Sequence, residues 1–326
     1  MPNKWHEPDG SDWRPKYPER VPILGEYNDQ ETMDKDIAAA ADHGVDAFSI
    51  LYYYNDPGSE REQHSRKLNR GITNFMNSPL SERMKFFVEF CNVPPFEVET
   101  DEQWDDCINQ WVEMMKHPSY LRVDGKLMFK VLGAKYFYEQ SGESIEQSNQ
   151  RLEKLRARVR SEGLGEMLIG GGVMNENEGD EDSFVPHIFK FTMTYMDMPP
   201  LVQAKEDYPY QLLADFAVKG RIGHGDEAIP HVPYVPAGWN PRPWLYPTRP
   251  FFAQPDSDQF VKALKQVKSD LDTYEHLGVP LGNGRRQKMF TIYAWNEFGE
   301  GGFIAPTKGA GYMKLKAIRE VFGSGQ

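Results

Sequence analysis

The chain has 326 residues, 39% of them hydrophobic and 26% charged, which is ordinary for a globular protein and compatible with a single α/β barrel. Its 37 lysines and arginines face 49 acidic residues, giving a net charge of −12 without a basic run, which argues against nucleic acid as a partner. No stretch approaches about 18 consecutive apolar residues and the first residues form no apolar leader, so we expect neither a membrane span nor a secretory signal in this sequence.

Apolar runs rich in β-branched and aromatic residues recur along almost the whole chain and predict strands. The predicted strands are 45–54, 85–92, 126–133, 166–173, 188–196, 228–235 and 288–295. These runs are continuous rather than alternating, as expected for parallel strands that are covered on both faces. Between them, apolar residues recur every three to four positions, which is typical of the buried face of a helix.

Helical patterns separate the predicted strands. The first covers Gln30–His43 and is closed by Gly44, and further apolar stripes occupy 104–115, 145–159, 260–274 and 312–322. Asp256–Asp258 supplies candidate N-caps for one of these helices. The two cysteines, Cys91 and Cys107, fall on a predicted strand and a predicted helix, so we expect free core thiols.

The alternation of strands and helices predicts parallel strands joined by right-handed crossovers. We therefore expect one (β/α)₈ barrel domain over residues 1–326. The count leaves one strand to find, because only seven strands are evident and the first clear element is a helix. Either Val21–Gly25 forms a short first strand, or that strand precedes Met1.

Active sites of such barrels lie at the carboxyl ends of the strands, so candidate binding residues can be listed by position. Polar side chains there cost free energy unless they face a solvated cleft or are hydrogen-bonded. An alternative for the charged residues within the strands is that they pair with each other inside the barrel, and the tryptophan of the 239–242 loop could pack inward. The candidates are Tyr53, Tyr54, Glu89, Asn92, Lys130, Tyr195, Trp239, Asn240, Arg242, Trp295 and Asn296.

The segment 289–302 is the most informative part of the chain. A strand-like run ends in Trp295, Asn296 and Glu297, and Glu300 follows three residues later between glycines, which allow a sharp turn. Two glutamates beside an indole suit acid/base chemistry on a sugar, whose apolar face stacks on the ring. The alternative is a strand end with two solvated glutamates. An aromatic content of 13% fits a carbohydrate cleft, although barrel cores also use aromatic residues.

Other catalytic and ligand motifs are weak or missing. The acidic run 175–182 lacks the glycine and glutamate positions of a calcium loop and is read as a solvated loop. The glycines at 170–172 lack the dinucleotide-binding frame, and neither a G-x-S-x-G nor an H-E-x-x-H motif occurs. We expect no metal and no cofactor, and an oligo- or polysaccharide as the partner.

The segment Ala294–Gly301 closely resembles the W-N-E-x-x-E-G signature of glycoside hydrolase family 99 and the related WbsX-like proteins. Weaker similarities follow in the same order along the chain. They cover 2–6, 25–29, 44–48, 52–54, 238–242, 304–307 and 311–312. The resemblance implies a (β/α)₈ barrel that hydrolyses α-linked sugars, notably α-mannosides, with retention of configuration.

The resemblance also implies separate roles for the two glutamates. The residue matching Glu297 would deprotonate the 2-hydroxyl of the substrate, whose oxygen displaces the leaving group to give a 1,2-anhydro sugar. The residue matching Glu300 would act first as the general acid and then as the base for water. This chemistry requires an ionised Glu297 and a protonated Glu300.

One departure from the family pattern lies between the two glutamates. Phe298 and Gly299 stand where the family-99 mannosidases carry Trp-His, so we expect an altered subsite and a different sugar preference. Two alternative functions remain. The first is a glycosyltransferase of polysaccharide synthesis, for which no D-x-D motif is present, and the second is a sugar-binding barrel without activity.

Overall fold

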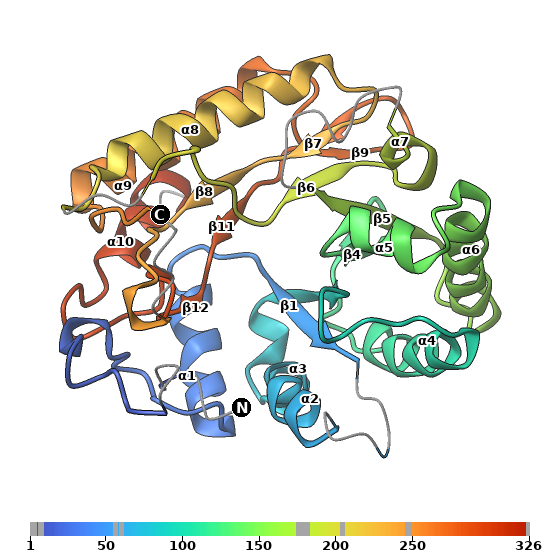
Figure 1. Ribbon diagram of the computed structural model, residues 1–326, viewed down its shortest axis with the longest axis horizontal. Helices are drawn as coiled ribbons and strands as arrows, with labels where there is room; N and C mark the ends of the chain where they lie inside the picture. Colours follow the sequence, from blue (N-terminus) through green and yellow to red (C-terminus); the bar gives the residue numbers. More distant parts are fainter. Residues whose placement is uncertain are drawn as a thin grey trace.

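The computed structural model describes residue 5, residues 10–54, residue 58 and residues 62–173, 183–202, 206–244 and 250–323, except for the side chains of residues 63 and 64. In these residues a parallel sheet is surrounded by helices (Figure 1). The architecture is the (β/α)₈ type that the sequence predicts.

The parallel strands follow the order of the chain around the sheet. They are β1 (Ala47–Tyr53), β2 (Lys85–Cys91), β4 (Lys126–Val131), β5 (Met167–Val173), β6 (Thr192–Thr194), β7 (His231–Val232), β8 (Tyr234–Pro236) and β11 (Thr291–Tyr293). Pro233 separates β7 from β8 because proline has no N–H to donate, and its carbonyl accepts from the Thr291 N–H at 2.9 Å. The β7–β8 segment therefore acts as one barrel strand, with β6 on one side and β11 on the other.

Short antiparallel pairs accompany this sheet. Strand β3 (Arg122–Val123) pairs with β4, and β9 (Val279–Pro280) pairs with β10 (Arg286–Gln287). Strands β12 (Asn296–Glu297) and β13 (Gly302–Phe303) form a hairpin directly after β11. This hairpin carries the segment that the sequence singles out.

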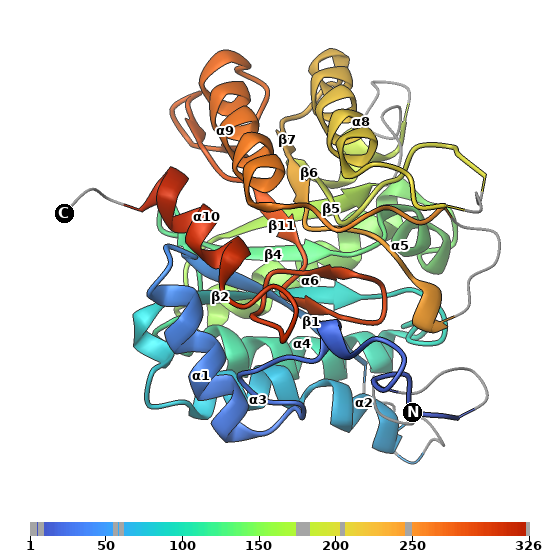
Figure 2. The same ribbon diagram turned by 90° about the vertical axis from the view of Figure 1, so that its left-hand side faces the viewer.

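Helices cover the outside of the sheet, and several begin at a side-chain cap. The described α-helices are α1 (Gln30–Ala41), α2 (Glu62–Leu68), α3 (Arg70–Asn77), α4 (Asp101–Met115), α5 (Ala134–Gln140), α6 (Ile145–Ser161), α7 (Val185–Ile188), α8 (Tyr210–Gly223), α9 (Ser257–Thr273) and α10 (Met313–Phe322). Asp256 accepts from the Gln259 N–H and closes a capping box at α9, which confirms the predicted cap. Helices α8 and α9 lie side by side, and α10 packs against α9 (Figure 2).

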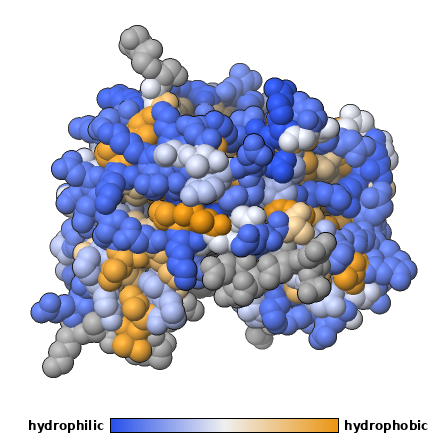
Figure 3. Space-filling view, turned by 90° about the horizontal axis from the view of Figure 1, so that it is seen from above, coloured by the Kyte–Doolittle hydropathy of each residue, from blue (hydrophilic) through white to orange (hydrophobic). Residues whose placement is uncertain are grey.

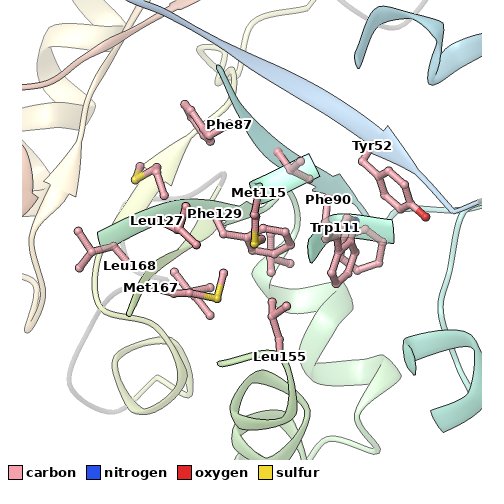
Figure 4. Close-up of a cluster of buried hydrophobic side chains, with 14 of the residues drawn as sticks. Tyr52, Phe87, Phe90, Trp111, Met115, Leu127, Phe129, Leu155, Met167 and Leu168 are labelled. Carbon is pink, nitrogen blue, oxygen red and sulfur yellow. The ribbon is translucent and has the colours of Figure 1, made fainter. Parts of the chain in front are cut away.

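Aromatic packing between the sheet and α4 forms the centre of the core. The Trp111 ring lies 5.0 Å from the Phe90 ring of β2 and 4.9 Å from the Phe129 ring of β4, measured between centroids, and Met115 and Leu155 pack beside them (Figure 4). Burying each of these large side chains contributes roughly 1.5–3 kcal/mol. Hydrophobic residues on the face in Figure 3 occur in small groups within a hydrophilic surface. Cys91 and Cys107 are buried and free, as predicted.

The expected first strand at Val21–Gly25 is not formed. In this segment only Pro22 makes a β-bridge, to Thr307 in the antiparallel sense, so that alternative is wrong. Among the described residues, no strand pairing joins β11 to β1. Six of the seven residues of β2 are buried, but only Tyr52 is buried in β1. The strands that flank this gap therefore lack the double cover of the others.

The strands of the second half are shorter than the sequence predicts. The predicted strand 188–196 contains only Thr192–Thr194, because α7 extends to Ile188. The predicted strands 228–235 and 288–295 contain β7, part of β8 and β11, with prolines at 230 and 233 limiting the ladder. By contrast β2 and β5 agree with their predictions to within one residue at each end.

Candidate active site

A hairpin at the carboxyl end of β11 carries both glutamates of the W-N-E-x-x-E-G motif. Asn296 pairs with Phe303 and Glu297 with Gly302, and the Glu300 N–H donates to the Glu297 carbonyl at 3.2 Å. Glu297 and Glu300 are both half-buried. The predicted turn thus places both carboxylates on one short loop at the end of the barrel strand.

The loop after β8 is fixed to this hairpin by close backbone contacts. The Asn240 N–H donates to the Glu300 carbonyl at 2.6 Å. A Cβ added to Gly238 would lie 2.6 Å from the Gly301 carbonyl oxygen, and one added to Gly301 would lie 2.7 Å from the Asn240 nitrogen. Both glycines also have positive φ angles, +139° and +77°. Glycine at these two positions therefore lets the two loops touch.

A tyrosine that the sequence analysis did not single out contacts Glu300 directly. The Tyr293 hydroxyl of β11 donates a hydrogen bond to Glu300 Oε2. The Tyr293 ring is 2% exposed and meets the Tyr195 ring edge-on at 5.1 Å. A Cβ on Gly302 would lie 2.3 Å from this ring, so the hairpin glycine makes room for it. Its place two residues before the end of the predicted strand 288–295 was the available signal.

Tyr53 and Tyr195 lie close enough to the two glutamates to be affected by their charges. The neighbouring Tyr52 points outward to α4, where its hydroxyl donates to Gln110 at 2.9 Å, so Tyr53 points inward by strand alternation. Burial raises the pKa of Tyr195 well above its usual value, and the charges of Glu297 and Glu300 raise it further. Burial is also the main cause that raises the pKa of Tyr53, with contributions from the same glutamates. Both hydroxyls therefore stay protonated as potential donors.

Glu89 and Lys130 form an ion pair inside the barrel, which is the alternative that the sequence left open. Lys130 Nζ lies 2.5 Å from Glu89 Oε1, and Ser49 Oγ donates to Glu89 Oε2 at 2.6 Å. Both charged side chains are at most 4% exposed. Lys130 Nζ also lies 5.5 Å from the Tyr195 ring centroid. The ion pair therefore lies next to the Tyr195 ring, and the charges of Glu89 and Lys130 compensate each other.

Two other candidates are used mainly within the protein. The Asn92 amide donates to the Gly133 carbonyl and accepts from the Gly133 N–H, both at 2.9 Å, and so joins the ends of β2 and β4. Tyr54 is 6% exposed and belongs to the main core cluster. These contacts give both residues a structural role. Asn55 and Asp56 come directly after the predicted strand 45–54 and lie outside the described residues. The acidic run 175–182 also lies outside them.

The 239–242 loop is mostly packed inward. Trp239 is 6% exposed and Asn240 4% exposed. The Trp239 Nε1 and the Asn240 Oδ1 are buried without a hydrogen-bond partner among the described residues. Arg242 forms an ion pair with Asp207 and lies over the Phe251 ring, with 4.5 Å between guanidinium carbon and ring centroid. The loop therefore meets Glu300 through the Asn240 backbone N–H, while its Trp239 and Asn240 side chains are packed inside the protein.

Trp295 and Phe298 pack away from the glutamates. The Trp295 ring lies 5.0 Å from the Phe48 ring of β1, and its Nε1 is buried without a partner among the described residues. Phe298 is 3% exposed and stacks at 5.7 Å on Trp5 in a cluster that includes Phe303. The Phe298 ring is therefore part of the core, so of the two residues between the glutamates only Gly299 is left to alter a subsite. Asn296 is exposed.

A buried lysine supports the hairpin from behind. Lys314 Nζ of α10 donates to the carbonyls of Ala237 at 2.7 Å and Phe303 at 2.8 Å, and to Gln254 Oε1 at 2.9 Å. Gln254 in turn donates to the Gly301 carbonyl at 2.7 Å. This network joins the end of β8 to the turn that holds Glu300. Its members are distant in sequence, so no local pattern could reveal it.

No cluster of three His, Cys, Asp or Glu side chains that could hold a metal ion occurs in the part of the chain that is described. None of the described helices is long and apolar enough to cross a membrane. Two surface hollows lie away from the glutamates, one between α9 and α10 beside Lys265 and Glu320, and one beside Lys116 and Arg122. The site itself is defined by the hairpin and the tyrosines around it.

No protein-family model matches the sequence, and no curated protein matches it. Among solved structures, the chain is similar to a GH99 endo-alpha-mannosidase from Bacteroides thetaiotaomicron, with a TM-score of 0.54, 15% identity, and coverage of 92% of this chain and 83% of that chain. A GH5-4 broad-specificity endoglucanase from Clostridium longisporum has a TM-score of 0.43, 9% identity, and coverage of 88% and 86%. A class V chitinase from Nicotiana tobaccum has a TM-score of 0.37, 11% identity, and coverage of 82% and 87%. The first of these likenesses establishes the barrel fold of this chain.

Proposed function

We propose that this chain is a retaining glycoside hydrolase for α-linked glycans, with Glu300 as the acid/base and Glu297 as the base toward the substrate's 2-hydroxyl. The observation that carries the proposal is the hairpin, which holds two half-buried carboxylates at the carboxyl end of β11 beneath a set of protonated tyrosines. The similarity in fold to a structure named as an endo-alpha-mannosidase supports an α-mannoside as the first substrate to test.

The reaction would proceed in two displacements at the anomeric carbon. Glu297 takes the proton of the 2-hydroxyl, the oxygen attacks C1, and Glu300 gives its proton to the departing glycosidic oxygen. The 1,2-anhydro ring is then opened by water, which gives a proton to Glu300 while Glu297 returns one to the 2-oxygen. Two inversions give net retention, and no enzyme atom becomes bonded to the sugar.

The surroundings of each carboxylate fit these roles. Tyr293 donates to Glu300 and would stabilise the carboxylate that forms once the proton has left. Tyr53 and Tyr195 offer hydroxyl donors near the glutamates. These groups replace Trp295 and Asn92 as the first choice of sugar contacts.

Separate Glu297→Gln and Glu300→Gln variants test the assignment. Each should reduce kcat on an α-linked manno-oligosaccharide by about 10²–10⁴-fold, because an acid/base group is lost while the shape is kept. Glu320→Gln, on the exposed face of α10, is the matched control and should leave kcat unchanged. Near-wild-type turnover in either hairpin variant would contradict the assigned roles.

The intermediate can be tested independently of the glutamates. A substrate lacking the 2-hydroxyl should not be cleaved, and intact-protein mass spectrometry during turnover should show no glycosyl-enzyme. Cleavage of the 2-deoxy substrate, or a covalent adduct, would overturn the anhydro-sugar route but leave a glycosidase. Heat released on titration with nucleotide sugars would instead favour a glycosyltransferase, and glycan binding without product release would favour a sugar-binding barrel.

A further inference from the structure

Gly299, between the two glutamates, has an indole lying directly on its backbone. A Cβ built at this residue would lie 2.5 Å from both Nε1 and Cε2 of Trp244, closer than real Cβ contacts allow. These atoms belong to the rigid ring, so any side chain at position 299 would displace the whole indole. Gly299 is itself buried, whereas Trp244 is half-exposed. Because Gly299 has no side chain, the indole of Trp244, a residue distant in sequence, can occupy the space beside it.

The position of Trp244 is set by contacts that are already shared with the hairpin. Trp244 ends a short 3-10 helix, Arg242–Trp244, and its N–H donates to the Pro241 carbonyl at 3.0 Å. The preceding residues are held by the ion pair of Arg242 with Asp207 and by the Asn240–Glu300 backbone bond. The indole and the acid/base carboxylate are therefore carried by two loops that are bonded to each other.

Trp244 differs from the other tryptophans in its surroundings. The buried ones are Trp5, Trp13, Trp104 and Trp111, at 0–1% exposed, and Trp239 at 6%. Trp295 is half-buried, but its ring packs on Phe48 and within the core clusters. Trp244 is half-exposed, and its indole lies against the turn between Glu297 and Glu300.

We infer that Trp244 forms the aromatic wall of the sugar subsite beside the catalytic glutamates, and that Gly299 is the specificity residue that admits it. The inference rests on the proposed function. A half-exposed indole offers a flat apolar surface on which the C–H face of a pyranose can stack. The hydroxyls of that pyranose can then reach the neighbouring carboxylates. The ligand class is therefore an α-linked oligosaccharide with one ring stacked on Trp244.

Binding to an inactive protein tests the wall without relying on turnover. In a Glu300→Gln background, calorimetry with α-linked manno- and gluco-oligosaccharides of two to four units should give a Kd raised about 10-fold by Trp244→Ala, and raised less by Trp244→Phe. Tyr274→Ala is the matched control, because Tyr274 follows α9 and lies at the opposite end of the barrel. Thermal unfolding should show that each variant is folded.

The contribution of Gly299 is isolated by a double-mutant cycle. Gly299→Ala should weaken binding as much as Trp244→Ala in the Glu300→Gln protein, yet should have no further effect once Trp244 is alanine, because it acts only by displacing the indole. Unchanged affinity in Trp244→Ala, with the glycan still bound and cleaved by the unmodified enzyme, would overturn the wall but not the hydrolase. Additive losses would overturn the assigned role of Gly299, and a complete absence of glycan binding would overturn both proposals.

Discussion

Two groups of charged residues lie within the barrel and at the end of its last strand, and they differ in how deeply they are buried. Glu89 and Lys130 are almost fully buried and are compensated by each other and by Ser49. Glu297 and Glu300 are half-buried on a hairpin, beside tyrosines whose pKa values burial keeps high. Glu89 and Lys130 thus have a structural role, whereas the carboxylates of Glu297 and Glu300 remain partly exposed at the carboxyl end of the barrel. The depth of burial therefore separates the structural pair from the candidate catalytic pair.

The largest effect on stability should come from breaking the compensated pair. Lys130→Met leaves the Glu89 carboxylate buried without its cation, and we expect the free energy of unfolding to fall by about 3–5 kcal/mol in urea denaturation. Replacing both residues, as Lys130→Met with Glu89→Leu, should cost much less, because no buried charge remains. A single variant as stable as the unmodified protein would show that Glu89 is not compensated by Lys130 alone.

A smaller loss should follow from removing the lysine behind the hairpin. Lys314→Met leaves carbonyl oxygens of Ala237 and Phe303 without their donor, at about 1–3 kcal/mol for each group that stays unsatisfied. Because these carbonyls adjoin the turn of Glu300, kcat should also fall. A variant with full stability and full kcat would remove Lys314 from the support of the site.

The same lysine predicts a pH dependence. Burial lowers the pKa of Lys314 to about 7, against an ordinary value of 10.5. Between these values the unfolded chain binds the proton more strongly than the folded one, so the stability of the unmodified protein relative to Lys314→Met should rise as the pH increases from about 7 toward 10.5. A difference that stays constant over this window would mean that the three oxygen acceptors keep the ammonium charged.

The smallest effect should come from the tyrosine that contacts the acid. Tyr293→Phe removes one hydrogen bond from Glu300 and should reduce kcat by roughly 10-fold, while the packing against Tyr195 is kept. The alkaline limb of the kcat–pH profile should move to higher pH, because the hydroxyl no longer stabilises the ionised carboxylate. A stability loss with an unchanged profile would instead make Tyr293 a packing residue.

The sequence predicted the first half of the barrel better than the second, for a physical reason. Strands β2, β4 and β5 are covered on both faces, so their apolar runs are long and unambiguous. The segments at 188–196 and 228–235 include apolar residues of a short helix and prolines that interrupt the ladder, and composition does not separate these from a strand. The segment Val21–Gly25 has a strand-like composition but finds no strand to pair with along its length.

The candidate site was predictable where it depended on local order. The turn with two glutamates after the last strand follows from Glu297, Glu300 and the glycines around them. Tyr293, Trp244 and Lys314 were not singled out, because their significance lies in contacts with residues elsewhere in the chain. Residue type indicated an aromatic site, but only the fold shows which aromatic rings are buried in the core and which lie beside the glutamates.

The gap between β11 and β1 has a consequence for local dynamics. The amide groups of β1 that point away from β2 have no partner strand among the described residues, and most of the strand is half-exposed. Opening at this edge separates few contacts, so hydrogen–deuterium exchange should be fastest here among the parallel strands and slowest in β4 and β5. The hairpin with both glutamates follows β11, which borders this gap. Local opening at the gap would therefore move the proposed catalytic glutamates before it affects the rest of the barrel.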